Sequence, residues 1–320
     1  MRDTILFGDC RETLKEFDEQ ARTCITSPPY YGLRDYGGED NQIGQEQTPE
    51  EFIEQLVSVF REVKNVITDD GTCWVNLGDS YYNYRPGKGQ ALVKQSVSKT
   101  KQDLPDKCNK RGNKLEGLKE KDLIGIPWLF AFAMRNDGWY LRQDIIWHKP
   151  NPMPESVRDR CTKSHEYIFL FSKNKKYYYN NEAIKEPAKD WGTRDRTKGK
   201  YHNEGTGLSP HTGLTKSYPT KNKRSVWSVT NKPYREAHFA TYPPDLIEPC
   251  IKAGSEVGDI VLDPFMGSGT TAAVAKALGR DYIGCELHED YGNLIKKRVE
   301  DYQTVNKVVQ EPSINILDII

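Results

Sequence analysis

Short apolar runs recur along the chain at lengths that suit buried β-strands. They lie at residues 5–7, 23–26, 73–77, 144–147, 167–171, 260–262 and 282–285. Patterns with the period of an α-helix lie between many of these runs. Strands that alternate with helices predict an α/β fold built on a doubly wound, mostly parallel sheet.

The clearest helical pattern starts at Thr48. Thr48 can cap the helix, Pro49 suits the first helical position, and Glu51 completes a capping box. Apolar residues then recur every three or four positions and form one face of the helix. Further helices are expected within residues 122–138 and 271–279.

Two segments, residues 84–121 and 173–236, interrupt the alternation. The first is rich in Lys, Gly, Gln and Ser and predicts a mobile insertion. The second mixes basic residues with tyrosine and tryptophan and predicts a partly folded subdomain.

Charge singles out the same two segments. The formal net charge is zero, but residues 173–236 hold 15 Lys and Arg against 6 Asp and Glu. Residues 84–122 hold 11 against 5, so the rest of the chain has a net charge of −15. Two basic blocks on an acidic body indicate a surface that binds a polyanion, although solvated loops would have a similar composition.

The seven cysteines lack the spacing of a metal site, and three of them lie inside apolar runs. A thiol in such a run acts as a small hydrophobic group, so we predict neither disulfides nor a bound metal. The sequence has no signal peptide and no apolar stretch near 18 residues. We therefore expect a cytoplasmic protein with no membrane partner.

A glycine-rich loop follows the apolar run at residues 260–262, with the sequence Asp263-Pro264-Phe265-Met266-Gly267-Ser268-Gly269-Thr270-Thr271. A strand, a tight FxGxG turn and a helix form a layout that binds a nucleoside-bearing cofactor at a sheet edge. Glycines let the backbone approach the ligand closely, and the spacing differs from the GxGxxG dinucleotide fingerprint. The next apolar run leads into Glu286, whose carboxylate can accept both hydroxyls of a ribose.

A second motif, Ser27-Pro28-Pro29-Tyr30, follows the apolar run at residues 23–26. It suits chemistry on an exocyclic amine, which is a poor nucleophile because its lone pair is delocalised into the ring. Ser27 and the Pro28 carbonyl can accept the two N–H groups and so aim the lone pair, while the prolines stiffen the loop. Tyr30 can stack on a base extruded from a duplex. The alternative is an ordinary proline-rich turn with a packed tyrosine.

With the two motifs in this order, the chain resembles the DNA amino-methyltransferases of the permuted group. The resemblance implies S-adenosylmethionine as cofactor and double-stranded DNA as partner. It also implies a seven-stranded class I methyltransferase sheet with one antiparallel strand and an inserted basic target-recognition region. The chain would then divide into a catalytic half (1–172, with the insertion 84–121), a target-recognition region (173–236) and a donor-binding half (237–320).

The resemblance also implies roles for particular residues. Asp9 is expected to face the adenine of the cofactor. The segment at residues 238–244, which includes Thr241, is expected to help enclose the cofactor. The other expected cofactor contacts are Asp263, Pro264, Phe265, Gly267, Ser268, Gly269, Thr270 and Glu286. The expected catalytic residues are Ser27, Pro28, Pro29 and Tyr30. In the target-recognition region, the candidates for contact with guanine edges or phosphates are Arg194, Arg196, Lys223, Arg224 and Arg235.

The target base is the main alternative left open. Many adenine-modifying relatives have Asp at the first motif position, so Ser27 favours N4 of cytosine, but its hydrogen-bond chemistry does not exclude N6 of adenine. The reversed motif order disfavours a protein glutamine methyltransferase. An RNA base methyltransferase and a catalytically silent DNA-binding module are further alternatives. The sequence is compatible with a partner restriction endonuclease and with a monomer or a homodimer.

Overall fold

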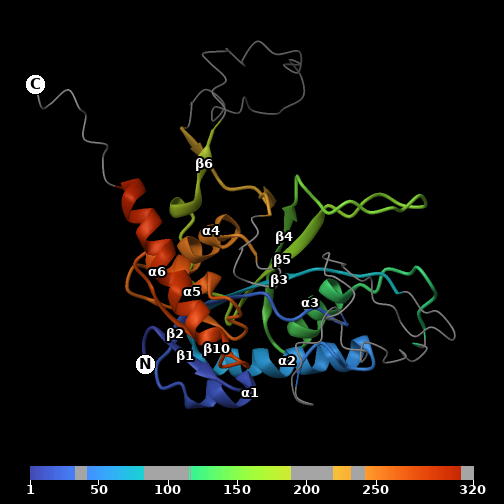
Figure 1. Cartoon of the computed structure of the whole chain (residues 1–320), viewed down its shortest axis with the longest axis horizontal. Coiled ribbons are helices and arrows are strands. Elements are labelled where there is room, and N and C mark those ends of the chain that lie inside the picture. The colour runs from blue at the N-terminus through green and yellow to red at the C-terminus, as the bar shows by residue number, and fades with distance from the viewer. Residues whose placement is uncertain (33–41, 83–114, 116, 189–218, 232–241, 311–320) are drawn as a thin grey trace, which may run out of the picture.

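The computed structural model describes residues 1–32, 42–82, 115, 117–188, 219–231 and 242–310 (Figure 1). Its strands are β1 (Thr4–Phe7), β2 (Ala21–Thr26), β3 (Ile67–Leu77), β4 (Tyr140–His148), β5 (His165–Ser172), β6 (Glu186–Pro187), β7 (Thr220–Lys221), β8 (Val226–Ser228), β9 (Ile260–Asp263) and β10 (Asp281–Glu286). Its α-helices are α1 (Cys10–Thr13), α2 (Pro49–Val66), α3 (Ile126–Asn136), α4 (Pro244–Gly254), α5 (Thr270–Ala277) and α6 (Tyr291–Gln310). Short 3-10 turns lie at Leu14–Glu16 and Glu182–Ile184.

A single large sheet organises the fold, with the strand order β1-β10-β9-β2-β3-β5-β4-β8. Strand β5 runs antiparallel to both of its neighbours, and the other pairs within the sheet are parallel. The predicted doubly wound, mostly parallel α/β sheet with one antiparallel strand is therefore confirmed. The described sheet has eight strands instead of the expected seven, because the short β8 pairs with β4 through Trp147 and Trp227.

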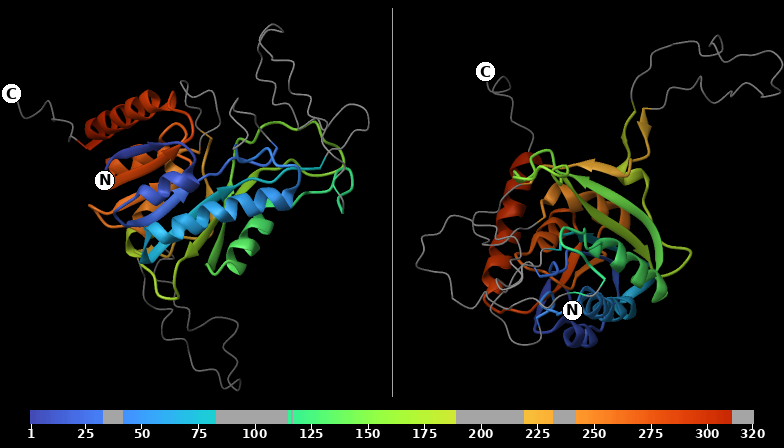
Figure 2. Two further views of the ribbon diagram at one scale, coloured as in Figure 1. Left: turned by 90° about the horizontal axis from the view of Figure 1, so that it is seen from below. Right: turned by 90° about the vertical axis from the view of Figure 1, so that its right-hand side faces the viewer.

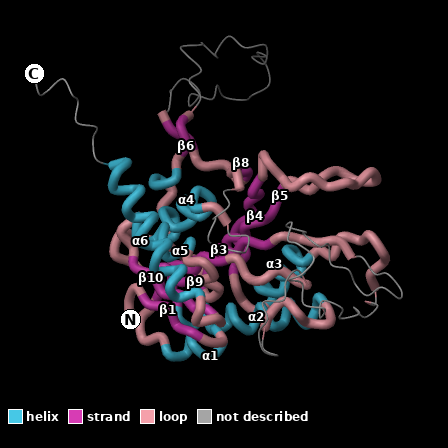
Figure 3. Tube along the Cα trace, in the orientation of Figure 1, coloured by secondary structure: helices cyan, strands magenta, loops and turns pink. Residues whose placement is uncertain are grey.

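Alternate side chains of each central strand point to opposite faces of the sheet. Cys24 of β2 belongs to the core under α1, α2 and α3, whereas its neighbour Ile25 belongs to the core under α4 and α5. Figures 2 and 3 show these two helical layers on either side of the sheet, with α6 outside α5. Burial on both faces explains why the central strands appear in the sequence as continuous apolar runs.

Helix α2 begins as the sequence predicts. The backbone N–H of Glu51 donates to Oγ1 of Thr48 at 3.2 Å, and the N–H of Thr48 donates back to Oε2 of Glu51 at 3.1 Å. The helix then packs on α3, where the ring centroids of Phe60 and Phe130 are 5.2 Å apart. Helices α2 and α3 pack on one face of β2 and β3, the strands that end at the candidate site.

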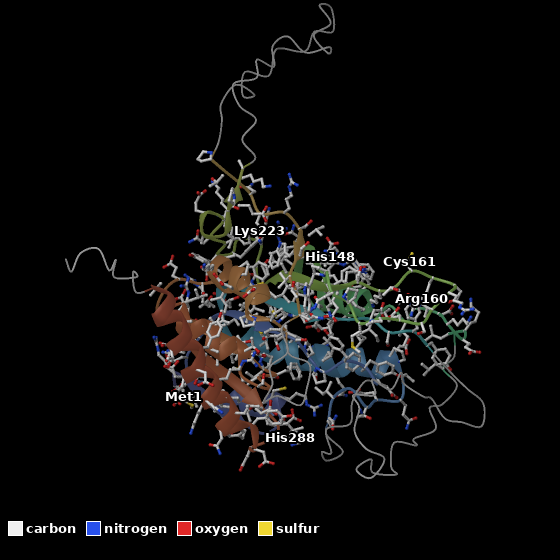
Figure 4. The ribbon with its side chains drawn as sticks, turned by 45° about the horizontal axis from the view of Figure 1, so that its top comes forward. Met1, His148, Arg160, Cys161, Lys223 and His288 are labelled. Carbon is white, nitrogen blue, oxygen red and sulfur yellow. The ribbon has the colours of Figure 1, made fainter. Side chains whose placement is uncertain are left out.

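The connection between β4 and β5, residues 149–164, projects from the sheet as an arm, on which Figure 4 labels Arg160 and Cys161. Strands β6 and β7 form a small antiparallel ladder and flank residues 189–218 in the sequence. That segment and most of the predicted insertion at residues 84–121 lie outside the described residues. In the parts of the chain that the structure describes, no helix is long and apolar enough to cross a membrane.

Candidate active site at the carboxyl edge of the sheet

The two sequence motifs meet at one edge of the sheet. Strands β2 and β9 are parallel neighbours with Cys24 opposite Leu262, so the chain leaves both strands on the same side. Strands β9 and β10 pair with Asp263 opposite Gly284, and β1 and β10 pair with Phe7 opposite Glu286. The carboxyl ends of parallel strands form the ligand-binding edge of such sheets.

Asp263, the last residue of β9, links the two motifs. Its carboxylate accepts a hydrogen bond from the hydroxyl of Thr26 at 2.6 Å, and Thr26 directly precedes the Ser27 loop. It also accepts from Thr271 at 2.5 Å, from Tyr242 at 3.1 Å and from the backbone N–H of Phe265 at 3.0 Å. Asp263 is 1% exposed, and burial raises the pKa of its carboxyl in spite of these four donors. Asp263 therefore acts here as an organising residue.

The glycine-rich loop depends on two backbone conformations. Gly267 has φ +53° and Gly269 has φ +83°, values that disfavour residues with a side chain. A Cβ on Gly269 would also lie 2.8 Å from Cγ2 and 3.1 Å from Cα of Ile295 on α6, whereas Gly267 has no such neighbour. The buried Ser268 between them accepts a hydrogen bond from Arg298. The loop is thus fixed by backbone geometry and by contact with α6.

Glu286 closes this loop from the neighbouring strand. Its carboxylate accepts from the N–H of Gly267 at 2.8 Å and from the N–H of His288 at 3.1 Å. Burial raises the pKa of the Glu286 carboxyl above its ordinary value. Within the described residues, the buried Nε2 of His288 has no hydrogen-bond partner. The site thus offers the acceptor oxygens of Glu286, the tight turn at Gly267 and the unpaired Nε2 of His288. These groups fit a ligand that has hydroxyl and heterocyclic groups.

Asp9 caps α1 after the carboxyl end of β1. It accepts from the backbone N–H of Arg11 at 2.9 Å and forms a salt bridge with the Arg11 guanidinium. Partial burial acts to raise the pKa of Asp9, but the hydrogen bonds from Arg11 outweigh it and the net pKa is lowered. Its side chain is engaged locally, and the expected contact with adenine stays a prediction.

The Ser27-Pro28-Pro29-Tyr30 loop follows β2 and faces the ends of β3 and β5. The Ser27 hydroxyl donates to Oδ1 of Asn76, the residue before the end of β3, at 3.4 Å. The Tyr30 hydroxyl donates to Oε2 of Glu166 on β5 at 2.7 Å, and its oxygen lies 3.3 Å from the same oxygen of Asn76. A hydroxyl whose hydrogen points to Asn76 turns its lone pairs elsewhere, so Ser27 can accept from an amine.

Two residues at this site were not identified from the sequence: Asn76 and Glu166. Asn76 carried a usable signal, because it is the one amide in the apolar run at residues 73–77 and is 4% exposed. A buried amide at the end of a strand beside the catalytic strand needs partners, and those partners prove to be the loop residues. Glu166 carried no comparable signal, because its contacts depend on strand order.

The predicted DNA contacts are only partly described. Arg194, Arg196 and Arg235 lie outside the described residues, as does the predicted cofactor contact Thr241. Lys223 lies over the Trp227 ring, 5.0 Å from its centroid, and its ammonium is 3.4 Å from Glu186, so it has a structural role in this region. Arg224 is exposed and remains a candidate, and Figure 4 places Lys223 on the same side of the molecule as His148.

His148, His165 and Cys250 have structural contacts. His148 Nδ1 is 3.0 Å from the Ser228 hydroxyl, and the His165 ring packs edge-on against Tyr167. Cys250 is 1% exposed in α4. Among the described residues, no cluster of His, Cys, Asp or Glu has the arrangement of a metal site.

Comparison with known proteins agrees with this geometry. The family model for N6- and N4-methyltransferases, described as DNA methylase, matches residues 21–297. The chain is 46% identical over 301 residues to the type II methyltransferase M.SmaI of Serratia marcescens, covering 92% of this chain and 90% of that protein. It is 44% identical over 302 residues to the type II methyltransferase M.Cfr9I of Citrobacter freundii, covering 94% and 89%.

The fold is also similar to solved structures. The PvuII DNA methyltransferase, described as cytosine-N4-specific, has a TM-score of 0.60 at 17% identity, with 96% of this chain and 92% of that chain covered. The M1.HpyAVI–SAM complex has a TM-score of 0.50 at 19% identity, with coverage of 92% and 98%. At these identities the likeness concerns the fold.

A doubly wound sheet with a glycine-rich loop and a Ser-Pro-Pro-Tyr loop at one edge is the arrangement of an amino-methyltransferase. This chain belongs to the family of S-adenosylmethionine-dependent DNA methylases that modify exocyclic amines. The family and cofactor implied by the sequence resemblance are therefore confirmed.

Proposed function

We propose that this protein transfers a methyl group from S-adenosylmethionine to N4 of a cytosine extruded from double-stranded DNA. The base assignment rests on the contact between the Ser27 hydroxyl and the Asn76 side-chain amide at the catalytic loop. Neither of these two groups is charged. A neutral acceptor suits the amine of cytosine, and adenine N6 is the alternative product. The PvuII neighbour is named as cytosine-N4-specific, and the fold alone relates it to this chain.

Ser27 and the loop prolines supply orientation. The Ser27 oxygen and the Pro28 carbonyl accept the two N–H groups of the target amine, which draws its lone pair out of the ring system. Pro28 and Pro29 restrict the backbone, so the Ser27 oxygen and the Pro28 carbonyl keep the same orientation from one turnover to the next. S-adenosylmethionine supplies an electrophilic methyl group on a sulfonium centre. On accepting this methyl group, the amine nitrogen held by Ser27 and Pro28 would release one proton to solvent.

Glu286 and its neighbours would hold the donor. The Glu286 carboxylate is placed to accept the ribose hydroxyls beside the turn at Gly267, which it already braces at 2.8 Å. Two large apolar side chains, Phe7 and Leu287, lie at the ends of the paired strands β1 and β10 and are 39% and 40% exposed. Such exposed apolar groups beside polar acceptors suit a purine ring. Asp9 would complete the site on the adenine side.

The basic segment at residues 173–236 would read the DNA sequence, and the insertion at residues 84–121 would close over the duplex. Extrusion of the base costs a few kcal/mol, which stacking on Tyr30 and contacts with phosphates would offset. The type II methyltransferases among the relatives support sequence-specific modification and a partner endonuclease as part of the proposal. A cytoplasmic location, and a monomeric or homodimeric state, stay predictions.

The base assignment is tested by incubating the protein with labelled donor and mixed-sequence duplex DNA and identifying the methylated nucleoside by mass spectrometry. N4-methylcytosine is the expected product. N6-methyladenine would overturn the base assignment and leave the donor site and mechanism in place. Donor binding with no methylated nucleoside would favour the silent DNA-binding module.

A further inference from the structure

Tyr30 is held at the hydroxyl end of its side chain. Its hydroxyl donates its one proton to Oε2 of Glu166 at 2.7 Å, and its oxygen lies 3.3 Å from Oδ1 of Asn76. Its ring lies against Gly78, where an added Cβ would come within 2.7 Å of Cε2 of Tyr30. Burial is the main reason that the pKa of the Tyr30 hydroxyl is raised well above its ordinary value. The negative charge of the nearby Glu166 carboxylate raises it further. The hydroxyl therefore keeps its proton and remains a donor.

Glu166 is held just as firmly on its other sides. Asn76 Nδ2 donates to Oε2 of Glu166 at 3.3 Å, and Lys149 forms a salt bridge with Oε1. The Glu166 and Lys149 side chains are only 15% and 17% exposed. The Lys149 ammonium also lies 4.1 Å from the centroid of the Trp147 ring. Because each partner is fixed in turn, the carboxylate offers Tyr30 a single anchoring position.

We propose that Glu166 is a positioning residue for the methylation reaction, which holds the Tyr30 ring ready to receive the extruded base. The inference rests on the proposed function and adds a role that lies on β5, outside both sequence motifs. A ring already held in place loses little conformational freedom when the base stacks on it. Glu166 acts through Tyr30, and the base itself contacts the ring.

A double-mutant cycle on the full-length protein tests this role. Tyr30→Phe removes only the hydroxyl, Glu166→Ala removes its acceptor, and the third variant combines both. Base extrusion is followed by the fluorescence of pyrrolocytosine at the target position in duplex DNA, or of 2-aminopurine if adenine is the target. The kcat and KM for DNA and the Kd for the donor are measured beside it.

Each single variant should reduce the extrusion equilibrium about tenfold or more, the effect of a hydrogen bond to a charged group, with the donor Kd unchanged. The double variant should lose little more than either single variant, because both remove the same contact. Glu166→Gln keeps the size and an acceptor oxygen and should recover part of the loss, which also covers the case in which Glu166→Ala folds poorly. Glu248→Ala, which removes a carboxylate paired with Lys252 on α4, is the matched control and should behave as wild type.

Additive losses in the double variant would show that Glu166 acts independently of Tyr30 and would overturn the inference. So would a Glu166→Gln variant that extrudes the base no better than Glu166→Ala when both are folded. If the wild-type protein methylates DNA in the same assay, either result leaves the proposed function standing. If the wild-type protein neither extrudes a base nor methylates DNA, the proposed function fails and this inference fails with it.

Discussion

The hydroxyl of Thr26 donates to the carboxylate of Asp263 across 2.6 Å, although the two residues are 237 positions apart in the chain. Thr26 ends β2 immediately before the catalytic loop, and Asp263 ends β9 immediately before the donor loop. Both are 1% exposed. This buried hydrogen bond fixes the distance between the loop proposed to orient the amine and the loop proposed to hold the methyl donor.

Replacing Thr26 by Val should therefore affect both stability and catalysis. The change keeps the shape but leaves a buried carboxylate with one donor fewer, at a cost of about 1–3 kcal/mol in the free energy of unfolding. Urea unfolding measures that cost, and single-turnover methylation measures the rate. Thr23→Val is the matched control, because Thr23 lies on the same strand and contacts the Thr72 hydroxyl at 2.9 Å instead of the site.

The two threonine variants separate a local role from a general one. We expect Thr23→Val to lose stability and to keep its single-turnover rate under folding conditions, whereas Thr26→Val should lose both. Equal rates for the two folded variants would contradict a link between the motifs through Asp263.

Gly269→Ala should destabilise the protein and abolish donor binding. An alanine at φ +83° is strained by roughly 1–2 kcal/mol, and its Cβ would in addition clash with Ile295 on α6. Gly258→Ala offers a matched comparison, since Gly258 has φ +85° and nothing within 4 Å of the added Cβ. Thermal unfolding and donor titration should show a small stability loss and normal binding for Gly258→Ala. Similar behaviour of the two variants would argue against tight contact between the donor loop and α6.

Donor affinity should depend on pH through Glu286. Burial raises the pKa of this carboxyl above its ordinary value of 4.5, so it takes up a proton at a higher pH than an exposed glutamate would. The protonated form is a poorer acceptor for ribose hydroxyls, so donor binding should weaken as the pH falls through that raised pKa.

Calorimetric titration at a series of pH values measures this effect. Glu286→Gln should bind the donor about tenfold or more weakly at neutral pH, and its affinity should not fall further with acid over that range. A variant that kept the wild-type pH profile would assign the titration to another group, with the neighbouring Asp263 as the first candidate.

Arg224 should contribute to the salt dependence of DNA binding. It is exposed beside β8, in the basic segment proposed to contact DNA. If it contacts one phosphate, Arg224→Gln should reduce the slope of log K against log salt by about 0.9. Filter binding at several salt concentrations gives the slope, and Lys252→Gln on α4 should leave it unchanged. An unaltered slope for Arg224→Gln would place the phosphate contacts elsewhere.

Local patterns were sufficient to predict much of the fold. Each of the apolar runs became a strand of the main sheet. The central strands β2 and β9 are buried along almost their whole length, whereas β1 and β4 are partly exposed. The start of α2 was predicted because Thr48, Pro49 and Glu51 lie close together in the sequence. The side chains of Thr48 and Glu51 accept hydrogen bonds from each other's backbone N–H groups, and Pro49 suits the first helical position. Strand β8 was not predicted, since Val226–Ser228 is too short for a periodic signal and is held mainly by pairing with β4.

The site was predictable as two motifs but not as a network. Ser27 and Gly267 belong to short contiguous patterns whose chemistry can be inferred from the sequence. The contacts that orient them, Asn76 with Ser27 and Glu166 with Tyr30, join strands that are neighbours only in the folded sheet. The four protein donors around Asp263 were likewise not predictable from the sequence, and its expected contact with the cofactor stays a prediction.

The central claim is that Ser27, aimed by Asn76, orients the target amine toward the donor loop. The most direct test is the single-turnover methylation rate of Ser27→Ala at saturating DNA and donor, together with its donor Kd. We predict a rate lower by on the order of 10²-fold, as for loss of one orienting group in a preorganised site, with the donor Kd unchanged. A Ser27→Ala variant with the wild-type single-turnover rate would contradict the account.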